Sequence, residues 1–194
     1  MPNWCNTIYK CVGDPKEVRK LTSQLKYMEK RKTSILSNDF GKMWLGNIVH
    51  KLGGNWEELR CRGEITDYSL DGNVLTIYQQ TAWCEQEGVR KIIEKVYPSI
   101  KVYYQEQESG CELFNTNDAL GEYFPERYFL DSYEDWEYFE TLDDAAKFVS
   151  KIIGHRVEPS VDALEKALDN YVEEHEEDNE NIFYSFHEFN VVKD

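Results

Sequence analysis

The sequence predicts an α+β protein in which a ferredoxin-like βαββαβ antiparallel sheet with a helical insertion precedes an acidic α+β C-terminal extension. Segments with strand-like and helix-like patterns follow one another in the order β-α-β-β-α-β, with the insertion after the first helix. An Asp-Gly pair marks a hairpin between the second and third strands. Beyond residue 118 the composition is acidic. We therefore expect a ferredoxin-like domain over residues 1–118, with the insertion at about 30–59. The extension over residues 119–194 is expected to pack on this domain, since no Gly/Ser/Pro-rich linker separates them.

The first two elements are a strand and a helix. Residues 4–12 mix β-branched and aromatic side chains, which is typical of a strand. Asp14 is a suitable N-cap, Pro15 suits the first helical position, and Glu17 lies at the third, as in a capping box. These signals predict that a helix begins at Pro15.

The insertion and a hairpin come next. The apolar residues of the segment 44–52 have helical spacing, and Gly53-Gly54 is expected to end this short helix. Asp71-Gly72 supplies the positive φ angles of a two-residue turn. We therefore expect residues 62–70 and 73–81 to form an antiparallel pair.

A second helix and a fourth strand complete the expected sheet. Residues 89–97 carry an i, i+3, i+4, i+7, i+8 apolar stripe closed by Pro98. Residues 100–104 alternate as a strand, and a turn at Ser109-Gly110 is expected to lead into residues 111–114. The expected result is a sheet of four strands that two helices cover on one face.

The acidic extension contains two further helices. Arg127–Tyr133 is strand-like, Thr141 is a suitable cap for a helix that Gly154 ends, and another helix begins near Pro159-Ser160. Residues 182–192 are again strand-like.

Charge is distributed very unevenly along the chain. Residues 1–104 hold 16 Lys+Arg against 12 Asp+Glu, whereas residues 105–194 hold 6 against 25, so the net charge of −15 is +4 followed by −19. An acidic surface attracts basic partners and repels nucleic acid and anionic membranes. Our leading hypothesis is a non-enzymatic binding protein that engages a basic protein surface, with a DNA mimic as a special case. The change of charge falls inside the expected fourth strand and is not a domain boundary.

The cysteines and the hydropathy indicate a cytoplasmic protein. The five cysteines are widely spaced and form no C-x-x-C motif: Cys5, Cys11, Cys61, Cys84 and Cys111. This pattern indicates free thiols in a reducing compartment. No apolar stretch approaches the roughly 20 residues that span a bilayer, and the N-terminus does not have the pattern of a secretory signal. We expect no membrane partner.

Topology predicts one candidate site. In a ferredoxin-like sheet the first strand is antiparallel to the third and fourth, so its start lies beside their ends. That edge would bring together two tryptophans, two thiols, two carboxylates and an amide: Asn3, Trp4, Cys5, Trp83, Cys84, Glu106 and Glu108. The alternative function is therefore a small-ligand-binding protein or an enzyme with its site here. Simple packing is the interpretation that these residue types favour, because tryptophan and unpaired cysteine are commonly buried.

No motif identifies a cofactor or a metal. A zinc site from Cys5, Cys84 and Cys111 lacks a fourth ligand, since the sequence places none of the four histidines near them. Glu85 and Glu87 disfavour Cys84 as a nucleophile, because they oppose a lowered thiol pKa at the helix start. The alternating Glu106 and Glu108 could bind a divalent ion, but among 37 acidic residues such pairs arise by chance. Tyr9 and Tyr78 could stack RNA bases on the sheet, an option that the overall charge opposes.

The chain resembles the YubB-type ferredoxin-like family of phage- and plasmid-associated proteins. The matching motifs are the opening Met1–Asn6, Thr81-Ala82-Trp83, Tyr97-Pro98 and the strand end from Tyr104 to Gly110. Cys84-Glu85 departs from the Ser or Pro that the family tends to have after the tryptophan. The resemblance covers about residues 1–118 and implies the fold and a mobile-element setting, but no catalytic residues.

Overall fold

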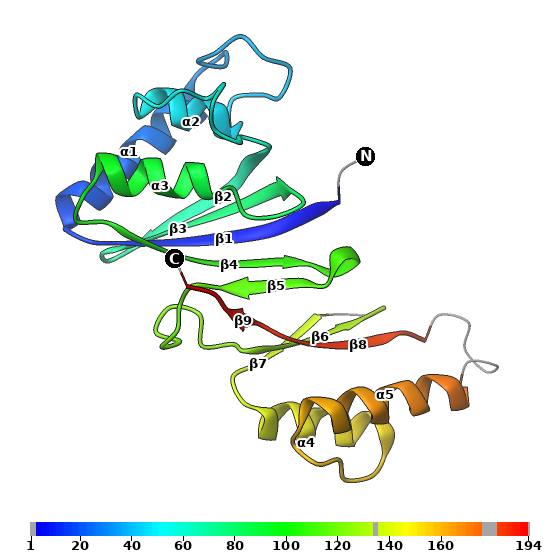
Figure 1. The fold of residues 1–194 in the computed structure, drawn as a ribbon. Coiled ribbons are helices and arrows are strands. Elements are labelled where there is room, and N and C mark those ends of the chain that lie inside the picture. Colours follow the sequence, from blue (N-terminus) through cyan, green and yellow to red (C-terminus); the bar gives the residue numbers. More distant parts are fainter. Residues whose placement is uncertain (1–2, 134–135, 176–181, 194) are drawn as a thin grey trace. The chain divides into compact units, whose positions relative to one another are not determined.

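The computed structural model describes residues 3–133, 136–175 and 182–193 (Figure 1). The chain divides into two units, one formed mainly by the residues up to Asn117 and one that runs from Asp118 to Val192. The structure is α+β, and none of the helices in the described ranges is long and apolar enough to cross a membrane.

The first unit is built on an antiparallel sheet. Its strands are β1 (Trp4–Val12), β2 (Gly63–Asp71), β3 (Val74–Ala82), β4 (Lys101–Glu108) and β5 (Leu113–Thr116). They lie in the order β2-β3-β1-β4-β5, and every neighbouring pair is antiparallel. The fifth strand corrects the four-stranded expectation: a 3₁₀ turn (Ser109–Cys111) follows β4, and the chain then returns to pair with it.

Three helices cover one face of this sheet: α1 (Pro15–Lys30), α2 (Leu45–Lys51) and α3 (Glu87–Val96) (Figure 1). As expected, Asp14 caps α1, and its Oδ1 accepts the Lys16 N–H at 2.8 Å. The expected capping box was wrong, because the Glu17 carboxylate accepts the backbone N–H and the hydroxyl of Ser99 instead. Glu17 therefore ties the start of α1 to the loop before β4.

The core lies between the helices and the sheet. Alternation along β1 buries Cys5, Thr7, Tyr9 and Cys11 on the covered face. Against this face pack buried residues of all three helices: Leu21 and Leu25 of α1, Leu45 and Ile48 of α2, and Val89 and Ile93 of α3. Each fully buried side chain of this size stabilises the fold by about 1.5–3 kcal/mol. Tertiary packing thus supports α2, which at seven residues is too short to be stable alone.

The hairpin between β2 and β3 forms one residue later than the sequence predicts. Asp71 pairs with Val74, so the two turn residues are Gly72 and Asn73. Gly72 has φ = 56°, and Asn73 has no positive φ, as in a turn that needs glycine only at its first central position.

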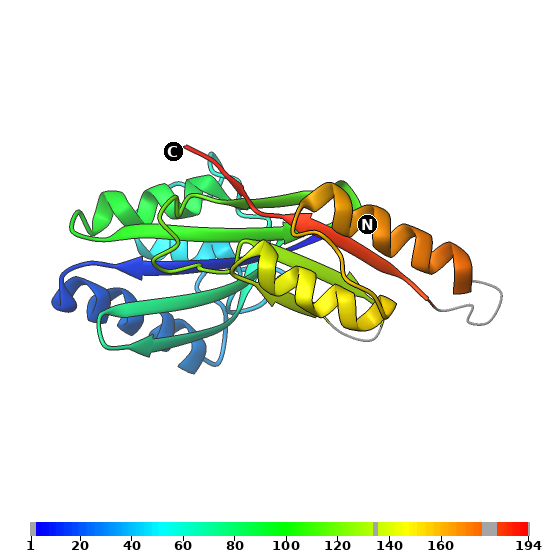
Figure 2. The same cartoon turned by 90° about the horizontal axis from the view of Figure 1, so that it is seen from below.

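The second unit has its own sheet and helices. Its elements are β6 (Tyr128–Ser132), β7 (Trp136–Phe139), α4 (Leu142–Ile153), α5 (Val161–His175), β8 (Tyr184–Glu188) and β9 (Asn190–Val191). The strands β7-β6-β8 are antiparallel, and both helices lie on one face of them (Figure 2). Thr141 caps α4 and Gly154 ends it, as expected. The sequence did not predict β7, and the single strand expected over 182–192 is two, separated by the buried Phe189.

The two units differ sharply in charge. Residues 1–117 carry 16 Lys+Arg and 15 Asp+Glu, whereas residues 118–192 carry 5 and 21. The change of charge after Tyr104 falls within β4, and three glutamates that follow it bring the first unit close to neutrality. Most of the excess negative charge therefore belongs to the second unit.

Candidate binding groove

The start of β1 lies beside the ends of β3 and β4. Trp4 pairs with Ala82, Asn6 pairs with Gln107, and the Trp83 N–H donates to the Asn3 carbonyl at 2.9 Å. The residues expected to form one site nevertheless separate into three groups. Trp4 and Trp83 line an open groove. Cys5 and Glu106 are buried, with the half-buried Cys84 near Glu106. Asn3 and Glu108 lie at the turn after β4.

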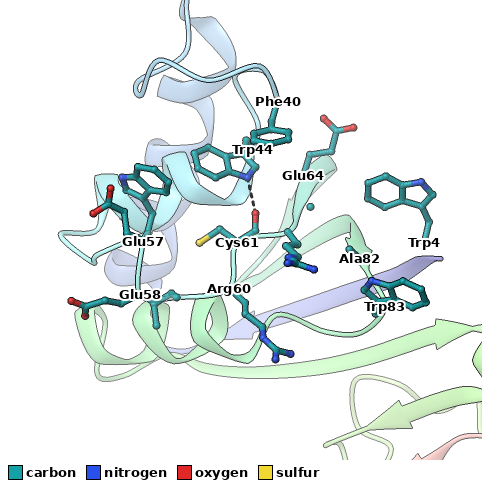
Figure 3. A pocket seen from close by; sticks show the side chains of 14 residues that line it. Trp4, Phe40, Trp44, Glu57, Glu58, Arg60, Cys61, Glu64, Ala82 and Trp83 are labelled. Atoms are coloured by element: carbon teal, nitrogen blue, oxygen red, sulfur yellow. Dashed lines mark hydrogen bonds between the residues drawn. The ribbon is translucent and has the colours of Figure 1, made fainter. Parts of the chain in front are cut away.

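The groove has a volume of about 1040 Å³ and is lined by four of the five tryptophans and one phenylalanine (Figure 3). Trp4 and Trp83 lie on one side, across from Phe40 and Trp44 (Figure 3). The lining set is Trp4, Phe40, Trp44, Trp56, Glu57, Glu58, Leu59, Arg60, Cys61, Arg62, Gly63, Glu64, Ala82 and Trp83.

One wall is an aromatic cluster with fixed geometry. The Trp44 ring lies 5.4 Å from Phe40 and 5.3 Å from Trp56, the second pair meeting edge to face. Trp44 is 7% exposed, and its indole N–H donates to the Cys61 carbonyl at 2.6 Å. Its ring packs so closely on Gly46 that an added Cβ would lie 2.3 Å from it. Trp44 is therefore held in place at the centre of this wall, whereas Phe40 is 66% exposed.

The opposite wall combines exposure with backbone strain. Trp4 and Trp83 are 52% and 44% exposed. Trp83 has φ = 74°, in the left-handed region, which costs an L-residue roughly 1–2 kcal/mol. Because strained residues cluster at functional sites, this conformation makes Trp83 a candidate ligand contact.

Five charged side chains surround the aromatic rings. Within the described ranges, none of the side chains of these exposed residues forms an ion pair or hydrogen bond: Glu57, Glu58, Arg60, Arg62 and Glu64. Both signs of charge therefore remain available to a ligand. Burial raises the pKa of the Cys61 thiol at the groove to about 11, which disfavours its thiolate form at neutral pH.

A polar network is buried beneath the sheet edge. The Tyr9 hydroxyl donates to Glu85 Oε1 at 2.5 Å, and Arg90 Nε donates to the same oxygen at 3.1 Å. The Glu85 N–H donates to Glu106 Oε2 at 2.5 Å, while Asn115 donates to Glu106 Oε1 at 2.9 Å. Burial raises the pKa of Glu85 and of Tyr9, and the Arg90 guanidinium opposes both shifts. These groups satisfy one another inside the fold.

The two thiols of the expected edge are not activated. Burial raises the pKa of Cys5 to about 11. The pKa of Cys84 is also raised, first by burial and then by the Glu106 carboxylate. Since α3 begins only at Glu87, Cys84 does not occupy its first turn.

The third group surrounds the turn after β4. Asn3 Nδ2 donates to Cys111 Sγ at 3.4 Å, and Glu108 Oε1 accepts the Gly110 N–H at 2.9 Å. Burial alone would raise the pKa of Glu108, but hydrogen bonds from Cys111, Gly110 and Asn3 outweigh it and lower that pKa. The hydrogen bond to Glu108 raises the pKa of the exposed Cys111 thiol.

The structure also bears on a metal site and on a base-stacking surface. Across the described residues, no three His, Cys, Asp or Glu side chains gather in a group that could hold a metal ion. Tyr9 pairs with Ile77, and Tyr78 pairs with Ile8, so the two tyrosines point to opposite faces of the sheet. Tyr9 is fully buried, and the pair does not form a stacking surface for bases.

Comparisons with known proteins reveal no relative. No family model, no curated protein and no solved structure matches this chain.

Sequence reasoning found one wall of the groove and missed the other. Phe40, Trp44 and Trp56 belong to the segment interpreted as an insertion, where the spacing of Trp44 predicts only a helical stripe. Three large aromatic side chains within 17 residues were the available signal.

Proposed function

We propose that this chain is a binding protein whose first unit holds an extended ligand in the aromatic groove. The observation that carries the proposal is Trp83, which is exposed at the groove despite an unfavourable backbone conformation. At about 1040 Å³ the groove reaches the upper end of small-molecule sites, roughly 300–1000 Å³. A segment of a longer molecule suits it better than a small metabolite.

The fixed wall favours tight binding. The hydrogen bond from Trp44 to the Cys61 carbonyl and the contacts of Trp44 with Phe40 and Trp56 order this side in advance. A preorganised site loses less conformational entropy on binding. Tryptophan is enriched among residues that dominate binding energy, because one ring buries a large apolar area.

Binding fits the chemistry better than catalysis. Cys5 and Cys61 have thiol pKa values of about 11, and the Glu106 carboxylate is engaged inside the fold. A general base or nucleophile needs a reactive form near neutral pH and access to substrate. These groups have neither property.

The proposal is tested by titrating the full chain calorimetrically with three polymers of different chemistry: a proline-rich peptide, a neutral oligosaccharide and a single-stranded oligonucleotide. We expect at least one to bind with a Kd below about 1 mM, about −4 kcal/mol. The W83A variant should lose that binding, whereas W136A, which removes an exposed tryptophan of the second unit, should retain it. Absence of binding by all three, or equal binding by W83A, would contradict the proposal.

A second candidate function rests on the charge of residues 118–192, which hold 21 Asp+Glu against 5 Lys+Arg. We propose that this unit engages a basic protein surface, with DNA mimicry as a special case. The chain should release a labelled DNA duplex from protamine, as fluorescence anisotropy would show. The effect should weaken steeply between about 0.05 and 0.3 M salt. No release, or release that does not depend on salt, would contradict it.

The fold family of the first unit is a separate proposal. We propose a ferredoxin-like domain, supported by the antiparallel order β2-β3-β1-β4 and by three helices on one face. Membership of the YubB-type family, a mobile-element setting and a cytoplasmic location rest on the sequence motifs and the cysteine pattern alone.

A further inference from the structure

We propose that the groove binds a proline-rich peptide segment that carries lysine or arginine. This inference rests on the proposed function and names its ligand. Proline-rich segments adopt the polyproline II conformation, and the domains that bind them do so through grooves lined with aromatic side chains. Here Trp4 and Trp83 face Phe40 and Trp44 across such a groove (Figure 3).

The hydrogen-bonding capacity of the groove matches this backbone. A polyproline II segment has no internal hydrogen bonds, so its carbonyl groups need external donors. The indole N–H groups of Trp4 and Trp83 donate to no partner within ranges 3–133, 136–175 and 182–193. The Arg60 and Arg62 guanidinium groups are likewise unpaired in that part of the chain. The groove therefore presents four donor groups, two indoles and two guanidiniums, and suits a ligand rich in acceptors.

The carboxylates determine the sign of the ligand's charge. Glu57, Glu58 and Glu64 are exposed at the groove, where they outnumber the two arginines. The whole chain carries −15 and attracts cationic ligands over a longer range. Lysine or arginine residues that flank the prolines would pair with these glutamates.

A phosphate-bearing polymer fits less well. Bases could stack on the tryptophans, and two arginines could contact phosphates. However, three glutamates are among the residues that line the same groove, and residues 1–117 carry no substantial positive charge. We therefore favour a peptide over single-stranded nucleic acid.

The decisive experiment is a calorimetric titration of the full chain with a blocked peptide of about ten residues, rich in proline and ending in arginine on both sides. Three comparison ligands are used: the same peptide with alanine for proline, the same peptide with glutamate for arginine, and a single-stranded oligothymidine. We expect each peptide change to weaken binding at least about tenfold and oligothymidine not to bind. Because these changes are made in the ligand, the result does not depend on any variant folding.

Protein variants locate the site. W83A and W4A should each weaken binding about 5- to 30-fold, which corresponds to the 1–2 kcal/mol typical of an important interface tryptophan. Combined E57Q and E58Q should weaken it about 2- to 10-fold, as expected for two exposed pairs. The matched controls W136A, and D169N with E173Q in α5, should have no effect.

The outcomes separate the two levels of the proposal. Binding of oligothymidine or a neutral oligosaccharide in a Trp83-dependent manner, with no binding of the peptide, would overturn the peptide assignment and leave the groove function standing. Equal affinity for the proline and alanine peptides would also overturn the assignment. Failure of every ligand to bind would overturn both.

Discussion

The groove and the buried network are built from neighbouring residues, but polar side chains have partners in the network and lack them in the groove. Trp4 and Cys5 are consecutive in β1, yet Trp4 is half exposed and Cys5 is fully buried. In the network, Tyr9 and Arg90 both donate to Glu85, whereas the five charged side chains of the groove lack partners within the described ranges. The difference indicates a division of roles. Satisfied polar groups stabilise the fold, and the exposed ones are those that we propose contact a ligand.

The largest expected effect is on the buried side of this comparison. Arg90 and Glu85 have side chains only 5% and 6% exposed, so R90M leaves a carboxylate without its cation. Breaking a buried pair in this way costs about 3–5 kcal/mol of unfolding free energy, measured by urea denaturation.

The adjacent Lys91 is the matched control. It pairs with Glu87 on the surface of the same helix, and its side chain is 62% exposed. K91M should change the unfolding free energy by no more than about 0.5 kcal/mol. Similar losses for R90M and K91M would show that the network does not stabilise the fold.

A smaller effect on stability is expected at the groove, where glycine should be more stabilising than alanine. Because Trp83 has φ = 74°, W83G should be more stable than W83A by about 1–2 kcal/mol, as glycine adopts this conformation without strain. Thermal or urea unfolding of the two variants measures the difference.

At an ordinary strand position the order reverses. Trp136 lies in β7 without a positive φ, so W136G should be less stable than W136A by about 0.5–1 kcal/mol. If W83A is as stable as W83G, the backbone at position 83 is not strained and the observation that carries the proposed function is lost.

Local signals predicted most of the secondary structure. Asp14 and Pro15 start α1, and Thr141 and Gly154 bound α4, because caps act within one turn of the chain. Glu17 shows the limit of this reasoning. Its spacing matches a capping box, but a residue 82 positions away binds its carboxylate. A tertiary contact of this kind leaves no trace in local sequence.

The candidate site was predictable only where strand pairing determined it. The neighbourhood of Asn3, Trp83 and Glu106 follows from topology, but which side chains are exposed depends on packing. Tyr9, Glu85 and Arg90 come together from a strand, a loop and a helix without a recognisable spacing. The wall formed by Phe40, Trp44 and Trp56 could not be predicted, because its position depends on where the segment 40–62 folds back.

The smallest expected effect concerns Cys111, whose environment shares one feature with the groove and one with the buried network. Its thiol is exposed like the groove residues, yet its hydrogen bond to Glu108 raises its pKa. At pH 8, iodoacetamide should modify Cys111 first and Cys84 more slowly, whereas Cys5, Cys11 and Cys61 should react only on unfolding because they are buried. Mass spectrometry of digested protein measures each rate.

The E108Q variant tests the cause of this reactivity. A neutral amide stabilises the protonated thiol less than a carboxylate does, so the Cys111 pKa should fall and its thiolate fraction at pH 8 should rise. Alkylation of Cys111 should then be faster than in the wild type, and the difference should disappear at high pH, where both thiols are ionised. E112Q, which removes a neighbouring exposed carboxylate, is the control and should leave the rate nearly unchanged. An equal rate in E108Q would mean that exposure alone, and not the carboxylate, determines how this thiol reacts.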